Sequence, residues 1–332
     1  MKKLKIGVIG CGGIAGLHLG LLAQRGDAVE LDAVADVRED AARAAAEKYQ
    51  VRTYGTDPLA LVSSKIDAVF VCAPTRHHAA LAALAMRRGI HVFCEKPMAR
   101  WVPAAEAMAF LSRKTGAHLQ VGFVRRFDDE WLAFRETIQA GKIGKPVVWQ
   151  DIQSHAGPAA AWYCQDEIGG GPFLDGAIHT IDFALYTFGP AEWVFANARS
   201  FREASTALDT GSATIRFQSG DELLLAWSWG LPKGCSGQRI FQLLGPSGTV
   251  RWNGVPAGSK TGSFVVHQGD RQEEVAYPAN ALMKGYERQI DEFLAVARGE
   301  AQPRAGSREG VDALRVANAI IQSGRTASVI RL

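Results

Sequence analysis

A glycine-rich turn between an apolar run and a helical pattern constrains this chain most. Residues 4–9 form a short apolar run of the kind that a buried parallel strand needs, and residues 14–22 place their apolar side chains at helical spacing. Between the two runs, Gly10, Gly12 and Ala15 fit the pattern G-x-G-x-x-G/A. The sequence therefore predicts a strand, a tight turn and a helix at the very start of the fold.

The residue types in this turn suit a bound pyrophosphate. Gly10 permits the tight turn, Gly12 lets phosphate approach the backbone because it has no Cβ, and Ala15 lets the helix lie close to the strand. The first amides of the helix, including those of Gly13 and Ile14, then point at the phosphates from the positive end of the helix dipole. We interpret the turn as a dinucleotide-binding motif.

An acidic residue ends the next apolar run and supports that interpretation. Residues 29–35 are followed by Asp36, and a carboxylate at the end of the second strand can accept hydrogen bonds from a ribose 2′-hydroxyl. The alternative is a helix N-cap, because Glu39 follows three residues later. A carboxylate repels a 2′-phosphate, so Asp36 predicts NAD. NADP stays open, because Arg38 could stack on adenine or tolerate the phosphate.

Bulk properties exclude several classes of protein. The 332 residues suggest two domains, and a composition of 47% hydrophobic and 21% charged residues is that of a folded chain. A formal charge of +3 predicts no nucleic-acid partner, and no apolar run is long enough to predict a membrane span. The five cysteines lack zinc spacing, and three of them end or follow apolar runs as reduced buried thiols do, so we expect no metal and a cytoplasmic location.

Two styles of secondary structure divide the chain near Val124. Residues 1–124 alternate strands and helices, which predicts a doubly wound parallel sheet of Rossmann type that binds the dinucleotide. Residues 125–332 are rich in strands separated by short turns, which predicts a substrate-binding and oligomerisation domain on a large, open, mostly antiparallel sheet. We expect the last strand of the first part over residues 117–124, one helix over residues 175–188, and two more helices at the end of the chain, over 284–298 and 308–323.

A lysine follows the predicted strand at residues 90–94. In Glu95-Lys96-Pro97, the proline biases Lys96 toward an extended backbone. Apolar neighbours would desolvate the amine partly, and desolvation lowers the pKa of a lysine, which suits a hydrogen bond to a reacting oxygen. The alternative is a surface lysine paired with Glu95.

A second group of candidate residues follows three consecutive glycines. Residues 169–171 predict a loop that approaches a ligand closely, and on the helix expected after it Asp175 and His179 lie four positions apart and share one face. The carboxylate could orient the imidazole, which could then move a proton near neutral pH. Asp182, three residues after His179, is a candidate partner for the other ring nitrogen. The alternative is an acidic helix cap with a buried structural histidine.

Taken in order, the glycine turn, Asp36, Glu95-Lys96-Pro97 and Gly-Gly-Gly-x-x-x-Asp-x-x-x-His resemble the Gfo/Idh/MocA oxidoreductases. Two smaller segments, residues 73–78 and 121–127, also resemble that family. The resemblance covers essentially the whole chain and includes inositol 2-dehydrogenases and glucose–fructose oxidoreductases. It implies an NAD(P)-dependent dehydrogenase that transfers a hydride between nicotinamide and a secondary alcohol of a sugar, inositol or related polyol.

The resemblance also implies roles for individual residues. Lys96 would contact the reacting hydroxyl and the cofactor, Asp175 would position the substrate, and His179 would transfer the proton. The implied cofactor site comprises Gly10, Gly12, Gly13, Ile14, Ala15, Asp36, Arg38, Ala73, Pro74, Thr75, His78, Glu95 and Lys96. Substrate contacts are expected from Arg126 and from Trp162 and Tyr163, whose rings could stack on a sugar or simply belong to a packed loop.

The resemblance leaves rival functions open. A redox-neutral NAD-dependent glycosidase and a non-catalytic NAD(P)-binding regulator both occur on this fold, and reduction of a non-sugar is not excluded. Related proteins associate through the second-domain sheet, so the resemblance implies a homodimer or homotetramer. The expected partners are thus a small polyol or sugar and further copies of the chain.

Overall fold

The computed structural model describes residues 2–63 and 65–332, which divide into two compact units. The first unit runs up to Phe123 and includes Glu287–Val311, and the second comprises Val124–Tyr286 and Asp312–Leu332. The returning segment is bonded within the first unit, where the amide of Val121 donates to the carbonyl of Ala305 at 2.8 Å. The two ends of this returning segment, Glu287 and Val311, fall within the two C-terminal helices.

The first unit is built on a six-stranded sheet in the order β3-β2-β1-β4-β5-β6, and every neighbouring pair is parallel. This order confirms the predicted Rossmann fold. Its strands are β1 (Leu4–Ile9), β2 (Val29–Ala35), β3 (Thr53–Gly55), β4 (Ala68–Val71), β5 (His91–Cys94) and β6 (Leu119–Val121). Its helices are α1 (Gly13–Ala23), α2 (Glu39–Tyr49), α3 (Pro58–Ser63), η1 (Thr75–His77), α4 (His78–Met86) and α5 (Val102–Thr115).

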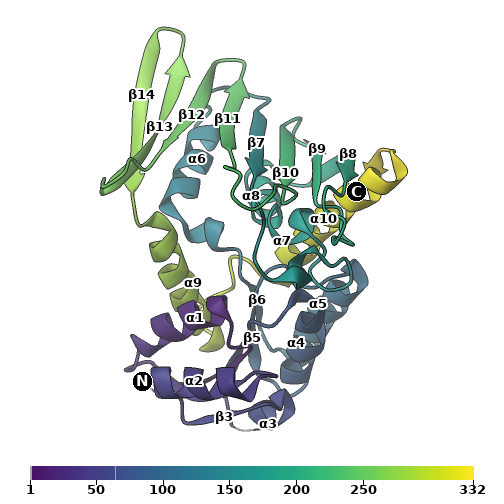
Figure 1. Cartoon of the computed structure of the whole chain (residues 1–332). Helices are drawn as coiled ribbons and strands as arrows, with labels where there is room; N and C mark the ends of the chain where they lie inside the picture. The colour runs from purple at the N-terminus through teal and green to yellow at the C-terminus, as the bar shows by residue number, and fades with distance from the viewer. Residues whose placement is uncertain (1, 64) are drawn as a thin grey trace. The chain divides into compact units, whose positions relative to one another are not determined.

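Burial explains why these strands read as continuous apolar runs. All four residues of β4 are buried, because helices cover both faces of a parallel sheet. Figure 1 shows α1 and α2 grouped separately from α4 and α5 in this unit. Residues after β1, β2, β4 and β5 all lie at the carboxyl edge of the sheet, and the strand order reverses between β1 and β4. Ligands bind at this edge in open α/β sheets.

The second unit contains a nine-stranded sheet in the order β14-β13-β12-β11-β7-β10-β9-β8-β15 (Figure 1). Its strands are β7 (Val148–Ser154), β8 (Ala191–Arg199), β9 (Thr210–Phe217), β10 (Glu222–Ser228), β11 (Arg239–Gly245), β12 (Gly248–Gly254), β13 (Thr261–Gln268), β14 (Arg271–Pro278) and β15 (Ile330–Arg331). Only the β7–β10 pair is parallel among the pairs of this sheet in the described residues, so the predicted mostly antiparallel sheet is confirmed.

An aromatic core fixes the helices of this unit against one face of the sheet. The helices wholly within this unit are η2 (Val124–Phe127), α6 (Asp129–Gln139), η3 (Ala161–Cys164), α7 (Pro172–Asp175) and α8 (Ile178–Phe188). The last two helices, α9 (Ala281–Ala297) and α10 (Ser307–Thr326), are each divided between the two units. The Trp131 ring of α6 lies 5.9 Å from Trp149 of β7 and 5.2 Å from Phe183 of α8. The opposite sheet face exposes Ile152, Phe195 and Ile240.

The structure corrects two details of the predicted elements. The helix expected over residues 175–188 is two helices, α7 and α8, because the amide of Ala177 bonds to Pro172, five residues back, at 2.8 Å. The strand expected to run to Val124 ends at Val121, and Val124 begins η2. Within residues 2–63 and 65–332, we find no helix with the length and apolar content to span a bilayer.

Candidate active site

The glycine turn has the geometry that a phosphate site needs. Gly10 has a φ of +91°, and a Cβ there would lie 2.7 Å from the backbone carbonyl group of Cys72, which directly follows β4. A Cβ on Gly12 or Gly13 would meet no described atom within 4 Å, so space lies in front of the first turn of α1. Ala15 is fully buried under that turn. Backbone amides at the N-terminus of α1 therefore face room for an anion.

Asp36 is held in place beside this turn. One carboxylate oxygen accepts the Cys11 amide at 2.8 Å, and the other accepts the Arg38 amide at 2.9 Å. The Arg38 Nε lies 3.9 Å from the same carboxylate. Burial and the Asp36 charge together raise the pKa of Cys11 to about 11, so this thiol is protonated at neutral pH. A fixed carboxylate next to a phosphate-binding turn suits an NAD ribose.

Glu95 and Lys96 follow β5 at the same edge of the sheet. The Glu95 carboxyl group is 6% exposed, and one of its oxygens accepts the Lys96 amide at 3.1 Å. The other oxygen lies 2.7 Å from Nε2 of His18, a buried residue of α1 to which the sequence analysis assigns no role. Its position one turn after Ala15 on an apolar helix indicates burial, but nothing local in the sequence names Glu95 as its partner.

His78 ties two loops of this edge together. Its Nε2 lies 2.7 Å from the carbonyl oxygen of Ala73, and its Nδ1 lies 2.8 Å from that of Pro97. Burial lowers the pKa of His78, and a neutral imidazole has one N–H, so it donates to one carbonyl at a time. Pro74 and Thr75 form the turn between these contacts and α4. The first unit thus collects the predicted cofactor residues at one edge of its sheet.

The three consecutive glycines of the second unit serve close packing. A Cβ on Gly169 would lie 2.6 Å from Cα of Tyr163, and one on Gly171 would lie 2.9 Å from the Ala207 side chain. Gly170 and Gly171 also have positive φ values of 77° and 81°. Close approach to the chain itself and backbone conformation therefore account for these glycines, and their approach to a ligand stays a prediction.

Asp175 and His179 lie on either side of the break between α7 and α8. Asp175 ends α7 and is 6% exposed, whereas His179 is the second residue of α8 and is partly exposed. The i, i+4 argument assumed one regular helix, so it does not apply across this break. Gly176 at the break packs against Trp227 and Trp229, since its Cβ would lie 3.0 Å from each indole. The two tryptophans therefore support the segment that carries both candidates.

Arg126 and Asp182 form a buried ion pair in the second unit. The Arg126 Nη2 lies 2.7 Å from one carboxylate oxygen of Asp182, and the Arg126 Nε lies within 3.1 Å of both. The guanidinium also lies over the Tyr186 ring at 4.6 Å. Arg126 was predicted to contact substrate, and Asp182 was a possible partner of His179. The structure pairs these two residues with each other inside the unit, and both roles stay predictions.

A neighbouring chain of hydrogen bonds involves residues that the sequence analysis did not single out. Arg125 donates to Thr180 at 2.7 Å, and the Thr180 hydroxyl donates to buried Asp151 at 2.6 Å. Burial lowers the pKa of Arg125 to about 10, which still leaves it cationic at neutral pH. These hydrogen bonds anchor the start of α8 to η2 and β7. The three residues are far apart in the sequence, so no local pattern predicts that they interact.

Trp162 and Tyr163 form a stacked pair in η3. Their ring centroids lie 3.7 Å apart, and the Tyr163 ring also meets Trp229 edge-on at 6.1 Å. The Trp229 indole donates to Nε2 of His155 at 3.1 Å. These contacts hold the pair next to the glycine loop, and both residues stay partly exposed. The arrangement is compatible with a stacking platform for a sugar ring.

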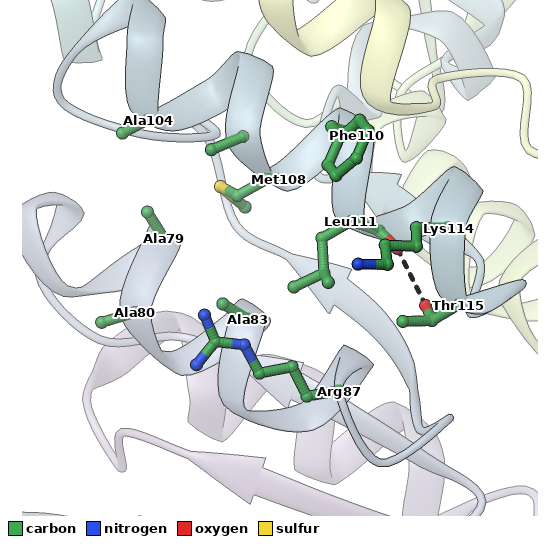
Figure 2. A pocket seen from close by; sticks show the side chains of 11 residues that line it. Ala79, Ala80, Ala83, Arg87, Ala104, Met108, Phe110, Leu111, Lys114 and Thr115 are labelled. Atoms are coloured by element: carbon green, nitrogen blue, oxygen red, sulfur yellow. Dashed lines mark hydrogen bonds between the residues drawn. The ribbon is translucent and has the colours of Figure 1, made fainter.

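Figure 2 shows an apolar groove of about 640 Å³ between α4 and α5. Alanine side chains of both helices line it together with Met108 and Leu111, and Arg87 and Lys114 lie along its border. None of the cofactor residues predicted above is among the described residues that line it, so the groove is separate from the carboxyl edge of the sheet. In the described parts of the chain, no three histidine, cysteine or acidic side chains cluster as a metal site would require.

Both units match one protein family. Residues 4–123 match the Gfo/Idh/MocA oxidoreductase family with an NAD-binding Rossmann fold, and residues 131–251 match the C-terminal domain of the same family. These matches confirm the resemblance found in the sequence.

Individual relatives agree. Myo-inositol 2-dehydrogenase of Thermotoga maritima is 35% identical over 65% of this chain and 66% of its own length, about two thirds of each. Inositol 2-dehydrogenase of Rhizobium meliloti is 30% identical over 96% of both chains. The crystal structure of the WlbA dehydrogenase from Bordetella pertussis, in complex with NADH and UDP-GlcNAcA, superposes with a TM-score of 0.84 at 25% identity and covers 100% of this chain and 99% of that one.

Proposed function

The chain belongs to the Gfo/Idh/MocA family and is an NAD(P)-dependent dehydrogenase acting on CH–OH groups, and we propose that it oxidises a secondary alcohol of a sugar, inositol or related polyol. The observation that carries this proposal is the common edge of the first sheet. Fixed Asp36, the glycine turn and Glu95-Lys96 all follow parallel strands there. A cofactor-binding carboxylate and a candidate amine thus belong to the same surface.

The residues at this edge fit NAD. Gly10, Gly12, Gly13, Ile14 and Ala15 bind the pyrophosphate through the turn and the first amides of α1. Asp36 binds the adenosine ribose, and Arg38 contributes to the adenine side. The remaining contacts, on the nicotinamide side, come from Ala73, Pro74, Thr75, His78, Glu95 and Lys96.

Bound NAD supplies the acceptor for the hydride that leaves the carbinol carbon. The protein must hold the hydroxyl oxygen and remove its proton, so that a carbonyl forms. Lys96 donates a hydrogen bond to that oxygen, His179 takes the proton, and Asp175 orients the substrate. These roles rest on the resemblance and on the chemistry of an amine, an imidazole and a carboxylate, and each is open to substitution.

The substrate class rests on the relatives and on the aromatic pair. Two relatives are named as inositol 2-dehydrogenases, and one related structure is a complex with UDP-GlcNAcA. Stacked Trp162 and Tyr163 offer an apolar ring face beside a polar loop, which suits the apolar face of a sugar or cyclitol ring. An NAD and NADP reduction screen over inositols, aldoses and sugar acids tests this class directly.

The decisive test of the chemistry is Lys96→Ala. We expect kcat to fall about 10²- to 10⁴-fold, the range typical of a lost acid–base or polarising group, while the Kd for NAD changes little. Lys114→Ala is the matched control, because Lys114 ends α5 on the groove side and lies outside the predicted site. Near-normal turnover of Lys96→Ala on the best substrate would remove Lys96 from the reaction.

The same screen separates the rival functions. A dehydrogenase changes the absorbance of reduced nicotinamide in proportion to the substrate consumed. A redox-neutral glycosidase would release product with no net change in that absorbance, and a regulator would bind cofactor without turning over any compound.

We also propose that copies of the chain associate through the second-unit sheet. The face opposite α6 and α8 carries Ile152, Phe195 and Ile240 with exposed fractions of 37%, 40% and 46%. Large apolar side chains on an open sheet favour burial against a partner. Light scattering should give a dimer or tetramer mass, and Phe195→Glu should shift that mass toward the monomer. A monomeric parent protein would contradict this assembly.

A further inference from the structure

The buried pair of His18 and Glu95 joins the cofactor helix α1 to the residue that follows β5 and precedes Lys96. His18 lies on α1, and its Nε2 is 2.7 Å from a carboxylate oxygen of Glu95, 77 residues later in the chain. The imidazole is fully buried and the carboxyl group nearly so. A buried ionisable pair of this kind is costly to form unless its hydrogen bonds are satisfied, so its presence at this edge calls for a function.

Aromatic rings hold the imidazole in one place. The centroid of the His18 ring lies 5.3 Å from that of Phe70 in β4 and 5.1 Å from that of Phe93 in β5. These two phenylalanines are themselves fully buried and stack on each other at 4.7 Å. His18 therefore presents Nε2 to Glu95 in a fixed direction from the core of the first unit.

The Glu95 carboxylate is fixed on its other side as well. Its second oxygen accepts the Lys96 amide at 3.1 Å. At the end of β6, a Cβ on Gly122 would come within 3.0–3.1 Å of the carboxylate atoms, so glycine leaves the room that this group occupies. One carboxylate thus contacts His18 of α1 and the Lys96 amide, and it lies next to Gly122 just after β6.

The charges around Glu95 favour its ionised form. Burial raises the pKa of Glu95, but the hydrogen bond and charge of His18, followed by Lys96, hold that pKa below its ordinary value. Burial raises the pKa of the Cys72 and Cys94 thiols, which stay protonated and uncharged, and it lowers the pKa of His78, which favours the neutral imidazole. The titratable groups that face Glu95 are His18, Cys72, His78, Cys94 and Lys96.

We propose that His18 is a positioning residue, which holds the Glu95 carboxylate in place as an anion. That carboxylate in turn fixes the backbone of Lys96 and keeps one negative charge next to it. This inference rests on the proposed function of Lys96. His18 touches neither substrate nor reacting atoms in this scheme. It acts through Glu95, and its loss leaves a buried carboxylate without its main hydrogen-bond donor.

Two substitutions separate this role from simple packing. His18→Leu removes the hydrogen bond at similar volume, whereas His18→Gln places an amide N–H at a similar reach from the helix. In His18→Leu we expect the pKa of Glu95 to rise by at least about one unit, since the hydrogen bond and charge of His18 are lost and only Lys96 still opposes burial. The acid limb of the kcat profile should move to higher pH by a similar amount, with the Kd for NAD within about threefold of the parent. His18→Gln should restore most of both changes.

The Glu95 readout does not need activity. Carbon-13 NMR of glutamate-labelled protein gives its pKa in the absence of cofactor and substrate, and Glu95→Gln assigns the signal. A Glu95 pKa at or above the ordinary range in the parent protein overturns the proposal, even if neither His18 variant folds. An unshifted Glu95 pKa or pH profile in folded His18→Leu overturns it as well.

The two proposals fail in different ways. Normal turnover of Lys96→Ala would end the proposed role of Lys96, whatever the Glu95 signal shows. An inactive Lys96→Ala together with an unperturbed His18→Leu would leave the dehydrogenase proposal standing and remove His18 alone.

Discussion

Replacing Asp36 with alanine should reverse part of the preference for NAD over NADP. The Asp36 carboxylate is already oriented, because the Cys11 and Arg38 amides bind one oxygen each at 2.8 and 2.9 Å. An oriented carboxylate can accept a ribose hydroxyl at little entropic cost. Hydrogen bonds to charged groups contribute about 1.5–3 kcal/mol. The Kd for NAD should therefore rise by about 10- to 150-fold, at about 1.4 kcal/mol for each factor of ten.

The same substitution should act in the opposite direction on NADP. Two unit charges about 5 Å apart repel by roughly 3 kcal/mol at an effective dielectric constant of about 20, so Asp36 opposes a 2′-phosphate. Without it, Arg38 loses a carboxylate that lies 3.9 Å from its Nε and becomes available to the phosphate. The Kd for NADP should stay constant or fall. The ratio of the two constants should thus shift toward NADP by at least about tenfold.

Calorimetric titration of both cofactors measures this ratio without any substrate. Asp67→Ala is the matched control: Asp67 also accepts a backbone amide, that of Lys5 at 2.7 Å, but it precedes β4 and so lies at the opposite edge of the same sheet. It should leave both constants unchanged. Equal losses of NAD and NADP affinity in Asp36→Ala would refute the assignment of Asp36 to the ribose.

Two further predictions concern the second unit, which urea unfolding followed by tryptophan fluorescence reports well, because seven of the eight tryptophans lie there and Trp101 is the eighth. Arg126→Met should lower the free energy of unfolding by about 3–5 kcal/mol, since it leaves a carboxylate buried without its cation. The control is Arg315→Met, which breaks an exposed ion pair and should lower the free energy of unfolding by less than about 1 kcal/mol. Equal losses in the two variants would contradict this reasoning. Asp128→Asn keeps the α6 N-cap but removes a carboxyl group whose pKa burial raises from 3.8 to about 6. The folded form binds this proton more tightly than the unfolded form. The free energy of unfolding of the parent should therefore fall by up to about 3 kcal/mol relative to that of the variant as pH rises from about 4 to 7. Parallel profiles of unfolding free energy against pH would count against this reasoning.

Local patterns were sufficient for much of this protein. The glycine turn, Asp36 and Glu95-Lys96-Pro97 each follow a short apolar run, and parallel strands place such residues at one edge whatever the rest of the chain does. Continuous apolar runs likewise indicated the parallel sheet, because both of its faces are buried, and strands separated by short turns indicated the antiparallel sheet.

Other features depend on contacts between distant segments. The sequence marks Gly169 and Gly171 as conformationally special, but only the fold shows that they pass against Tyr163 and Ala207. The break after Asp175 is similar, since Trp227 and Trp229 pack against Gly176 from a strand some 50 residues away.

What the sequence by itself determined is the class of fold, the cofactor turn and the family, since each depends on short-range spacing. Only the tertiary structure decided that Glu287–Val311 belongs to the first unit, that Arg126 pairs with Asp182, and that His18 binds Glu95. The physical reason is that a buried polar group must find a partner, and the partner is whichever group the packed core brings within hydrogen-bond distance. No spacing along the chain encodes that choice.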